Sequence, residues 1–320
     1  MQYIAHEHGR LALSETEKPL LKSNEVMVKV VAIGVNRADS MQRQGMYPAP
    51  PSDSAILGLE CSGTVVELGS DVDTTWLNQR VFTLCAGGAY AEYVAVDAKQ
   101  LMPLPDQLSF EEGAALSEVY LTAFGALFEL GKLQSGQTAL IHAGASGVGG
   151  AAIQMAKSAG ATVVITAGSE EKCNHAIALG ADHAINYKTT NFVDYMQAHH
   201  LTANVIVDPV AGRYLNKNAV IAAMDCQIIM LAFLDGRFAE VDFAGLLQKR
   251  ISFHASTLRN RDTDFKRTLR DDFVTRFYQK LADKTYDFNI YKVLPWSEAN
   301  EAHTILENNQ NAGKLILTVK

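Results

Sequence analysis

Cysteine is scarce in this sequence, and its few residues form no pattern. Cys61, Cys85, Cys173 and Cys226 lie far apart, and none of them belongs to a C-x-x-C pair. Zinc sites and disulfide frameworks both show closer and repeated spacings. We therefore expect four reduced thiols that are mostly buried.

Long apolar segments and runs of one charge are also missing. No apolar stretch approaches the roughly 18 residues of a membrane-spanning helix. The N-terminal segment MQYIAHEHGRLALSE is polar and acidic where a signal peptide would need an apolar stretch. The net charge of −7 argues against binding to nucleic acid but is compatible with a basic pocket for one phosphate. We expect a cytoplasmic protein that binds neither membranes nor nucleic acid.

A chain of 320 residues is expected to form about two domains. Between residues 25 and 96, short β-rich runs alternate with glycine-containing turns, which predicts a small all-β, barrel-like module. Residues 110–130 show helical apolar spacing, and Ser109 is the expected N-cap.

Strands and helices alternate in the middle of the chain. Strand-like runs lie near residues 138–143, 162–167, 183–187, 204–208, 227–233 and 251–257. Alternation on this scale predicts parallel βαβ units and a doubly wound sheet, so the fold class is α/β. After about residue 284 the pattern returns to strands. The last strand, 313–319, could complete the first module, which would then be split in the sequence.

A glycine-rich turn, 144–150 (GASGVGG), joins the strand at 138–143 to a helix at 151–157. A dinucleotide site needs glycines here for a tight turn, for close approach of the backbone to the pyrophosphate, and for packing of the helix on the strand. The spacing is not a strict G-x-G-x-x-G, so a tight turn without a ligand is the alternative.

The next strand ends at Gly168 and Ser169, followed by Lys172. An NAD site usually carries an acid at this point to bind the ribose 2′-hydroxyl. A small polar residue followed by a cation suits a 2′-phosphate, which favours NADPH over NADH. Glu170 and Glu171 are the counter-evidence, and we expect both in the first turn of the following helix, where its dipole favours acids.

Five motifs together resemble one known family. They are 34–39 (GVNRAD), Tyr47 with the prolines after it, 58–63 (GLECSG), 87–93 (GGAYAEY) and the glycine turn. In this order they resemble the zinc-free quinone oxidoreductases of the medium-chain dehydrogenase/reductase superfamily. The resemblance implies a GroES-like β-barrel catalytic domain (residues 1–119 and 286–320) and a Rossmann NADPH-binding domain (residues 120–285), with the active site between them.

The resemblance also implies roles for individual residues. Asn36, Asp39, Tyr47 and Thr122 match residues near the nicotinamide. The residues that match the cofactor-binding set are Ala145, Ser146, Gly147, Val148 and Gly149 at the pyrophosphate, Gly168, Ser169, Lys172 and Tyr187 at the 2′-phosphate, and Phe233, Arg259 and Lys314. Five of these residues also have a purely structural interpretation. Asn36 and Asp39 could fix a turn, Tyr47 could be a partly buried loop residue, Thr122 an ordinary helix residue, and Lys172 a surface lysine. Glu60 could order the site by accepting backbone hydrogen bonds, and the sequence favours a structural role for it no more than a catalytic one.

The zinc-dependent relatives in this superfamily provide a contrast. Their catalytic zinc uses a cysteine where this sequence has Asn36 and a histidine where it has Leu59, and the third ligand falls near Glu118. Their four-cysteine lobe would lie at 84–88, where only Cys85 is present. The resemblance therefore implies a site without metal.

Three functions stay open from the sequence. The first is reduction of quinones by NADPH, through hydride or one-electron transfer. The second is reduction of the activated C=C bond of enals or enones, which also needs an acid for the α-carbon. The third is a non-catalytic protein that binds NADPH or RNA. Phe233 and Leu234, in a loop that departs from the family pattern, could narrow or close the site. Relatives commonly form dimers through their sheet edges, so we expect a homodimer or a tetramer.

Overall fold

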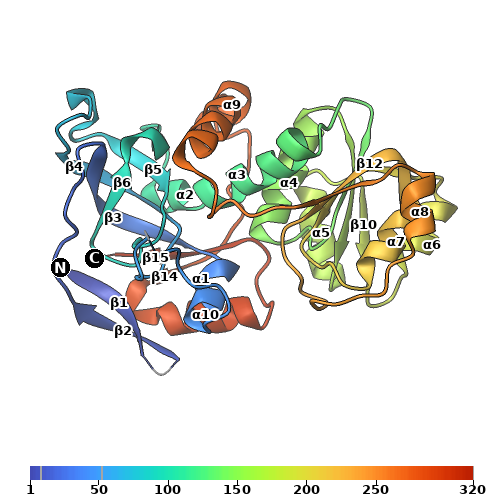
Figure 1. Cartoon of the computed structure of the whole chain (residues 1–320), viewed down its shortest axis with the longest axis horizontal. Helices are drawn as coiled ribbons and strands as arrows, with labels where there is room; N and C mark the ends of the chain where they lie inside the picture. Colours follow the sequence, from blue (N-terminus) through green and yellow to red (C-terminus); the bar gives the residue numbers. More distant parts are fainter. Residues whose placement is uncertain (8, 52, 320) are drawn as a thin grey trace. The chain divides into compact units, whose positions relative to one another are not determined.

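The computed structural model describes residues 1–7, 9–51 and 53–319. The chain divides into two compact units, and each is described by itself. Unit 1 combines Met1–Leu121 with Arg259–Lys320, and unit 2 is Thr122–Leu258. A β-rich unit split in the sequence and a second, α/β unit agree with the predicted fold class (Figure 1).

Unit 1 is built on a seven-stranded sheet whose central strand is β3 (Glu25–Val35). The other strands are β4 (Glu60–Leu68), β5 (Arg80–Leu84), β6 (Tyr93–Asp97), β7 (Leu101–Pro103), β14 (Ile290–Pro295) and β15 (Lys314–Thr318). The order is β14-β15-β3-β4-β5-β7, and β6 pairs with β3; a hairpin of β1 (Gln2–Glu7) and β2 (Arg10–Glu15) forms a separate two-stranded sheet. Because β15 pairs antiparallel with β3, the last strand completes the first module, as predicted.

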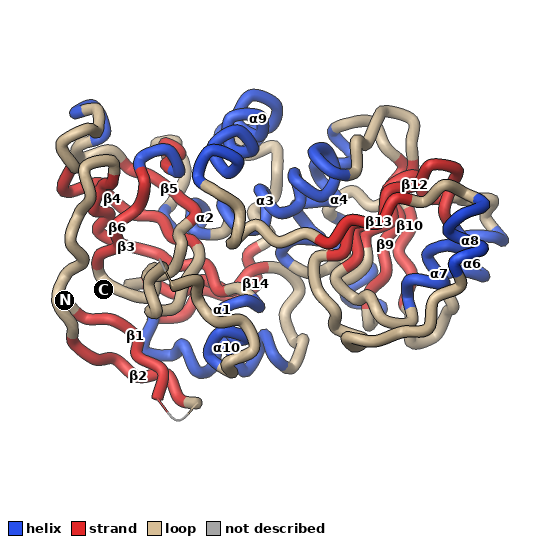
Figure 2. Tube along the Cα trace, viewed as in Figure 1, coloured by secondary structure: helices blue, strands red, loops and turns tan. Residues whose placement is uncertain are grey.

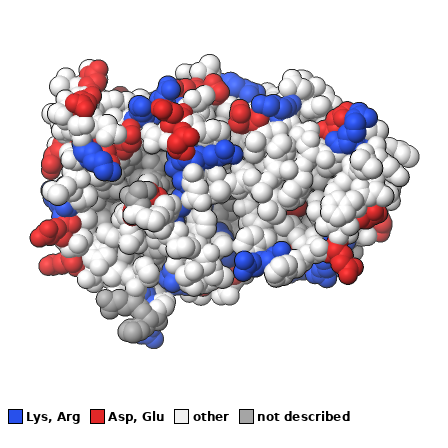
Figure 3. Space-filling view, viewed as in Figure 1, with Lys and Arg blue, Asp and Glu red and all other residues white. Residues whose placement is uncertain are grey.

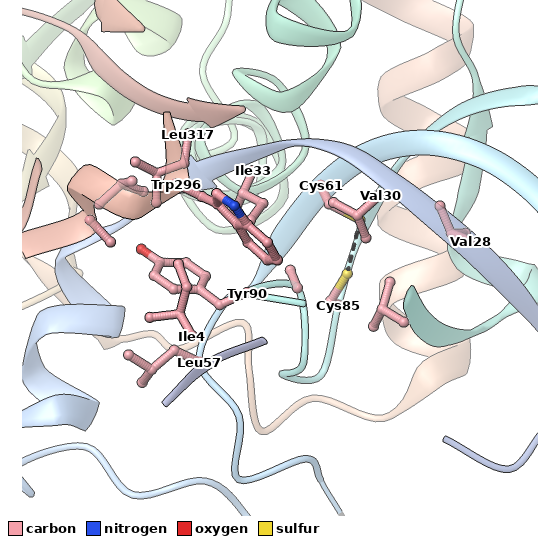
Figure 4. Packing of buried hydrophobic residues seen from close by; sticks show 14 of the residues in the cluster. Ile4, Val28, Val30, Ile33, Leu57, Cys61, Cys85, Tyr90, Trp296 and Leu317 are labelled. Atoms are coloured by element: carbon pink, nitrogen blue, oxygen red, sulfur yellow. Dashed lines mark hydrogen bonds between the residues drawn. The ribbon is translucent and has the colours of Figure 1, made fainter. Parts of the chain in front are cut away.

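The core of unit 1 lies on this sheet. Alternate residues of β3, such as Val28 and Val30, belong to one buried cluster with Ile4, Tyr90 and Trp296 from distant parts of the chain (Figure 4). Burial of apolar side chains drives this packing at about 25 cal/mol per Å² of apolar surface. All four cysteines are free and buried, which confirms the prediction from their spacing.

Helices complete unit 1. They are α1 (Arg37–Arg43), α2 (Phe110–Ala114), the first part of α3 (Ser117–Phe124), α9 (Thr263–Ala282), α10 (Ala299–Glu307), and the 3-10 turns η1 (Thr74–Trp76), η2 (Ala98–Gln100) and η4 (Trp296–Glu298). Ser109 caps α2 as predicted, since its hydroxyl accepts the N–H of Glu112 at 3.1 Å. The predicted helical region 110–130 is divided into α2, α3 and a π-helical turn, η3 (Gly125–Leu130).

The long helix α9 lies in unit 1, whereas the expected boundaries assign residues 259–285 to the nucleotide-binding domain. Its buried residue Phe273 packs on Tyr120, with ring centroids 5.9 Å apart. Arg270 donates to the carbonyl of Leu101 at 2.9 Å and Tyr278 to that of Pro103 at 2.6 Å. These contacts with β7 explain why the helix joins the first unit.

Unit 2 is a six-stranded parallel sheet with the order β10-β9-β8-β11-β12-β13. Figure 2 colours its strands red and its helices blue. Its strands are β8 (Thr138–Ile141), β9 (Thr162–Ala167), β10 (His183–Asn186), β11 (Ala203–Asp208), β12 (Ala222–Met230) and β13 (Ser252–Ala255). The helices are α4 (Gly147–Ser158), α5 (Glu170–Ala178), α6 (Phe192–Ala198), α7 (Tyr214–Ile221) and α8 (Phe243–Gln248). The predicted doubly wound parallel sheet is therefore confirmed.

In the described part of the chain, no helix is both long and apolar enough to cross a membrane.

Candidate functional site

The glycine-rich turn of unit 2 leads from β8 into the N-terminus of α4. Ser146 is the N-cap, and its hydroxyl accepts the backbone N–H of Gly149 at 3.0 Å. Ala145 is buried, whereas Ser146, Gly147 and Val148 are only half-buried. The start of a twelve-residue helix is thus accessible, and its N–H groups and dipole favour a phosphate.

Two glycines of this turn are needed because the backbone approaches closely. A Cβ on Gly149 would lie 2.5 Å from the carbonyl oxygen of Gly144, and a Cβ on Gly144 would lie 2.5 Å from the Ile165 side chain on β9. Both would require the turn or the strand to shift. The turn therefore has the close helix–strand packing that a pyrophosphate site requires, and it fits a dinucleotide.

The residues expected around the 2′-phosphate come together at the end of β9. Ser169 is the N-cap of α5, and its hydroxyl accepts the N–H of Lys172 at 3.3 Å. A Cβ on Gly168 would lie 2.8 Å from the hydroxyl of Tyr187, which places that hydroxyl beside Gly168. Lys172 is half-buried, and Tyr187 is 48% exposed.

Glu170 and Glu171 lie in the first turn of α5, as predicted. The Glu170 carboxylate accepts the side-chain N–H of Asn186 at 2.9 Å, so this acid has a partner within the unit.

Thr122 and Phe233 lie in unit 2 but away from these two groups in the chain. Thr122 is a half-buried residue of α3. Phe233 and Leu234, in the loop after β12, are 43% and 57% exposed, and the Arg237 guanidinium lies 5.9 Å from the Phe233 ring.

The candidate residues of unit 1 gather around a buried ion pair. The Lys314 ammonium lies 2.6 Å from Glu60 Oε1, and their side chains are 3% and 0% exposed. Lys314 also donates to Asn36 Oδ1 at 2.7 Å and to the Val35 carbonyl at 3.0 Å. Glu60 accepts the Asn36 amide at 2.9 Å and the backbone N–H of Glu118 at 2.8 Å. Lys314 and Asn36, expected from the sequence as separate contacts, therefore belong to one cluster.

Asp39 lies beside this cluster in the first turn of α1. Its Oδ2 accepts the N–H of Asn36 at 2.8 Å and the hydroxyl of Tyr90 at 3.3 Å. Among the described residues its buried Oδ1 has no hydrogen-bond partner. Burial raises the pKa of Asp39 to about 7, although the Asn36 N–H and the Lys314 charge oppose this effect. A carboxyl that is partly protonated near neutral pH can act as an acid.

Tyr90 extends the hydrogen bonds to His303 on α10. The Tyr90 hydroxyl and His303 Nε2 are 3.0 Å apart, and both residues are buried. Burial lowers the pKa of His303 to about 4, so the imidazole is neutral in the pH range in which Asp39 titrates. Neither residue is among those expected from the sequence: Tyr90 belongs to the GGAYAEY motif, but nothing in the sequence around His303 indicates its place.

Tyr47 and Arg259 meet on the same unit. The Arg259 guanidinium lies 5.5 Å from the centre of the Tyr47 ring and donates to Gln42 Oε1 at 2.7 Å. Arg259 is buried, and its Nη2 has no hydrogen-bond partner among the residues that the structure describes. The Asp53 carboxylate lies 3.9 Å from Arg259 Nε, so the guanidinium charge already faces an anion, and the Nη2 N–H group is suited to a carbonyl ligand.

The positions that match zinc ligands carry other groups. The Asn36 amide is bound to Glu60 and Lys314, and Leu59 is buried. Over residues 1–7, 9–51 and 53–319, no three His, Cys, Asp or Glu side chains are arranged to hold a metal ion.

Two family models match this chain. Residues 22–106 match the alcohol dehydrogenase GroES-like domain, and residues 147–272 match the zinc-binding dehydrogenase model.

Curated relatives agree with these matches. The chain is 31% identical over 221 residues to the quinone oxidoreductase of Rattus norvegicus, which covers 68% of this chain and 67% of that protein. It is 36% identical over 201 residues to the synaptic vesicle membrane protein VAT-1 homolog of Danio rerio, covering 62% of this chain. The matched region spans 42% of that relative, less than half of its length.

Solved structures resemble the whole chain. The Escherichia coli quinone oxidoreductase complexed with NADPH has a TM-score of 0.87 and 26% identity, and 99% of each chain is covered. The CurF ER cyclopropanase from the curacin A biosynthetic pathway has a TM-score of 0.84 and 27% identity, covering 97% of this chain and 95% of that one.

The burial of Asp39 predicts a pH dependence of stability. Its pKa in the folded protein is about 7, above the ordinary value of 3.8, so the folded chain holds the proton more tightly than the unfolded chain. The resulting stabilisation is complete below about pH 4 and is lost as the pH rises through about 7. Relative to Asp39→Asn, the free energy of unfolding of the unmodified protein should fall by about 1.4 kcal/mol per pH unit in this window.

Urea unfolding of both proteins at several pH values measures this difference. His303 titrates in the opposite sense and is present in both proteins. A difference in unfolding free energy that is constant between about pH 4 and 8 would show that Asp39 titrates normally.

Proposed function

This chain belongs to the quinone-oxidoreductase type of the medium-chain dehydrogenase/reductase superfamily, and we propose that it reduces quinones with NADPH without a metal ion. The observation that carries the proposal is the group of Gly168, Ser169, Lys172 and Tyr187 at the end of β9, next to a turn that fits a pyrophosphate. The relative of known structure in complex with NADPH supports the same cofactor. A reaction site between two domains stays a prediction.

We assign the cofactor to residues of unit 2. Ser146, Gly147, Val148 and Gly149 would hold the pyrophosphate at the start of α4, with Ala145 in the turn. Lys172 supplies a cation, and Tyr187 and Ser169 supply hydroxyls, to the 2′-phosphate. When bound, NADPH supplies the reducing equivalents, as a hydride or as single electrons.

The cluster in unit 1 supports a reaction without zinc. The Glu60 carboxylate is neutralised by the Lys314 ammonium, and the Asn36 amide is held between them. A quinone is already electron-poor, so hydrogen bonds and a fixed positive charge suffice to polarise its oxygen. Asp39, Tyr47 and Arg259 offer such groups within unit 1. The Asn36 amide is already bound to Glu60 and Lys314, and Asn36 is proposed, with Thr122 and Phe233, beside the nicotinamide.

Reduction of enals or enones is the second candidate, and Asp39 favours it. This reaction must protonate the α-carbon, and a buried carboxyl with a pKa of about 7 is a suitable acid. The similarity to the CurF ER cyclopropanase supports this alternative as much as the oxidoreductase relatives support the first.

A non-catalytic role in binding NADPH or RNA is the third candidate. The net charge of −7 disfavours RNA, and acidic and basic side chains are interspersed on the face shown in Figure 3. NADPH binding without turnover of any acceptor would support this role.

A substrate panel tests the proposal directly. We expect NADPH oxidation with a benzoquinone, with kcat/KM roughly tenfold or more above that with NADH and above that with an alkenal. If no quinone supports NADPH oxidation but the alkenal does, the second candidate is established instead. The same assay after prolonged chelation should give unchanged rates, and a loss that zinc restores would contradict the metal-free proposal.

Lys172→Glu tests the 2′-phosphate assignment. The variant should raise the KM for NADPH roughly ten- to hundredfold and leave the KM for NADH nearly unchanged, because hydrogen bonds to charged groups contribute about 1.5–3 kcal/mol. The matched control is Lys132→Glu, which reverses an exposed charge of the same unit. Parallel changes in both KM values would place the 2′-phosphate elsewhere.

We further propose that the protein forms a homodimer through β13. Its location in the cytoplasm stays a prediction. Among the described residues β13 pairs with β12 alone, and Phe253 on it is 45% exposed. The neighbouring α8 exposes Phe243 and Leu247. An open strand edge beside apolar side chains is suited to pairing with a second copy.

Sedimentation velocity should show twice the mass of the chain for the unmodified protein. Phe253→Lys should shift it to the mass of one chain, because a charge on an edge strand opposes pairing. Leu20→Lys, at an exposed apolar residue of unit 1, is the control and should leave the mass unchanged. A monomeric unmodified protein contradicts the proposal, and a tetramer requires a second interface.

A further inference from the structure

Four buried polar side chains form a hydrogen-bonded chain in unit 2. His142 follows β8, Thr166 lies on β9, Asp208 ends β11, and Asn218 lies on α7. His142 Nδ1 is 3.0 Å from Thr166 Oγ1, and His142 Nε2 is 2.8 Å from Asn218 Oδ1. Asn218 Nδ2 donates to Asp208 Oδ2 at 3.0 Å. All four side chains are almost completely buried.

The chain of bonds has one direction. Because the Asp208 carboxylate only accepts, Asn218 must present its NH₂ group to Asp208 and its oxygen to His142. His142 therefore carries its proton on Nε2, and its Nδ1 accepts the Thr166 hydroxyl. Burial lowers the pKa of His142, so the ring stays neutral between Phe192 and Tyr214, whose ring centroids lie 5.0 and 4.9 Å away.

The far end of the chain fixes the turn after β11. Asp208 Oδ1 accepts the backbone N–H groups of Val210 and Ala211, each at 2.8 Å. Ala211 has a φ of 54°, a left-handed conformation that is unfavourable for a residue with a Cβ. The two bonds to the carboxylate offset that cost.

This turn lies at the point where the strand order reverses. β8 and β11 are neighbours, but the chain leaves β8 toward β9 and leaves β11 toward β12, in opposite directions along the sheet. Open parallel sheets bind their ligands outside the carboxyl ends of the strands at this point. The backbone N–H of His142 donates to the Val207 carbonyl at 3.0 Å, and the glycine-rich turn begins two residues later, at Gly144. The chain of bonds thus connects both loops that flank the reversal.

We propose that His142 and Asn218 are positioning residues for the dinucleotide site. Acting through Asp208, they hold residues 209–212 in the conformation that binds the nicotinamide cofactor. This inference rests on the proposed function, because it assigns the reversal point to the cofactor.

Asn218→Asp tests the inference by placing a second carboxylate beside Asp208. At low pH the two carboxyl groups share a proton and the chain stays closed, whereas at high pH both ionise, repel each other and release the turn. Isothermal titration of the full chain with NADPH should give a Kd close to that of the unmodified protein at about pH 6, and at least tenfold weaker at about pH 8.5. The ratio of the two proteins' Kd values removes the titration of the ligand itself.

Two further variants make the test specific. Asn191→Asp is the matched control, since it makes the same change at the exposed N-cap of α6, where aspartate caps equally well. The double variant Asn218→Asp with Asp208→Asn exchanges the carboxylate and the amide. The new carboxylate at position 218 accepts from His142, and the new amide at position 208 donates to that carboxylate and accepts the N–H groups of Val210 and Ala211. The affinity for NADPH should therefore return, and its pH dependence should disappear.

The outcomes separate the inference from the proposed function. If Asn218→Asp lowers the melting temperature at high pH but the folded protein keeps its affinity for NADPH, the hydrogen bonds among the four buried side chains serve only stability and the inference is wrong. If the unmodified protein binds NADH instead of NADPH, the cofactor proposal fails and the same titrations are made with NADH. Binding of neither cofactor overturns both.

Thr166→Val provides the test if Asn218→Asp does not fold. It keeps the shape of the side chain but removes the donor to His142 Nδ1. The inference expects NADPH affinity to fall by roughly threefold or more, since a net hydrogen bond contributes about 1 kcal/mol. Unchanged affinity overturns it.

Discussion

The buried ion pair between Glu60 and Lys314 is the interaction on which the candidate site of unit 1 depends. Burying two charges costs several kcal/mol for each ion unless every donor and acceptor is satisfied. Here the three ammonium protons of Lys314 go to Glu60, to the Asn36 side chain and to the Val35 carbonyl. The second oxygen of Glu60 accepts the N–H of Glu118. The pair thereby joins β4, β15, the end of β3 and the start of α3.

The same cluster explains the behaviour of Asp39. The Lys314 charge is already used by Glu60, so Asp39 has no cation of its own, and the neighbouring Glu60 carboxylate opposes its ionisation. Backbone and tyrosine donors favour the ionised form but do not offset full burial. Two carboxylates thus face a single lysine. The lysine neutralises Glu60, and the proton that Asp39 retains neutralises the second carboxylate.

Local patterns in the sequence predicted what is local in the structure. The glycine-rich turn and the two acids of α5 lie within a few residues of the strand that precedes each of them. Lys314 and Glu60, in contrast, are 254 residues apart, and the family resemblance predicted Lys314 but not its partner.

Two other features could not be predicted from neighbouring residues. Nothing beside His303 or Asn218 in the sequence indicates Tyr90 or Asp208 as a partner, because each pair is made by tertiary packing. The helix α9 could cover either core by its composition, and its contacts with Leu101, Pro103 and Tyr120 decide between them.

Both units use buried carboxylates to hold backbone that the helices and strands leave unpaired. Glu60 accepts the N–H of Glu118, Asp39 that of Asn36, and Asp208 those of Val210 and Ala211. A buried N–H without a partner is costly, so these segments have little freedom to adapt to different ligands. The side chains of Phe233 and Leu234 are less constrained, since they are 43% and 57% exposed, although the Leu234 backbone N–H donates to the Pro209 carbonyl at 3.2 Å. Under the proposed function, substitutions at these two residues offer the least costly way to change which acceptor the protein reduces, whereas changes at the buried carboxylates would first disturb the fold.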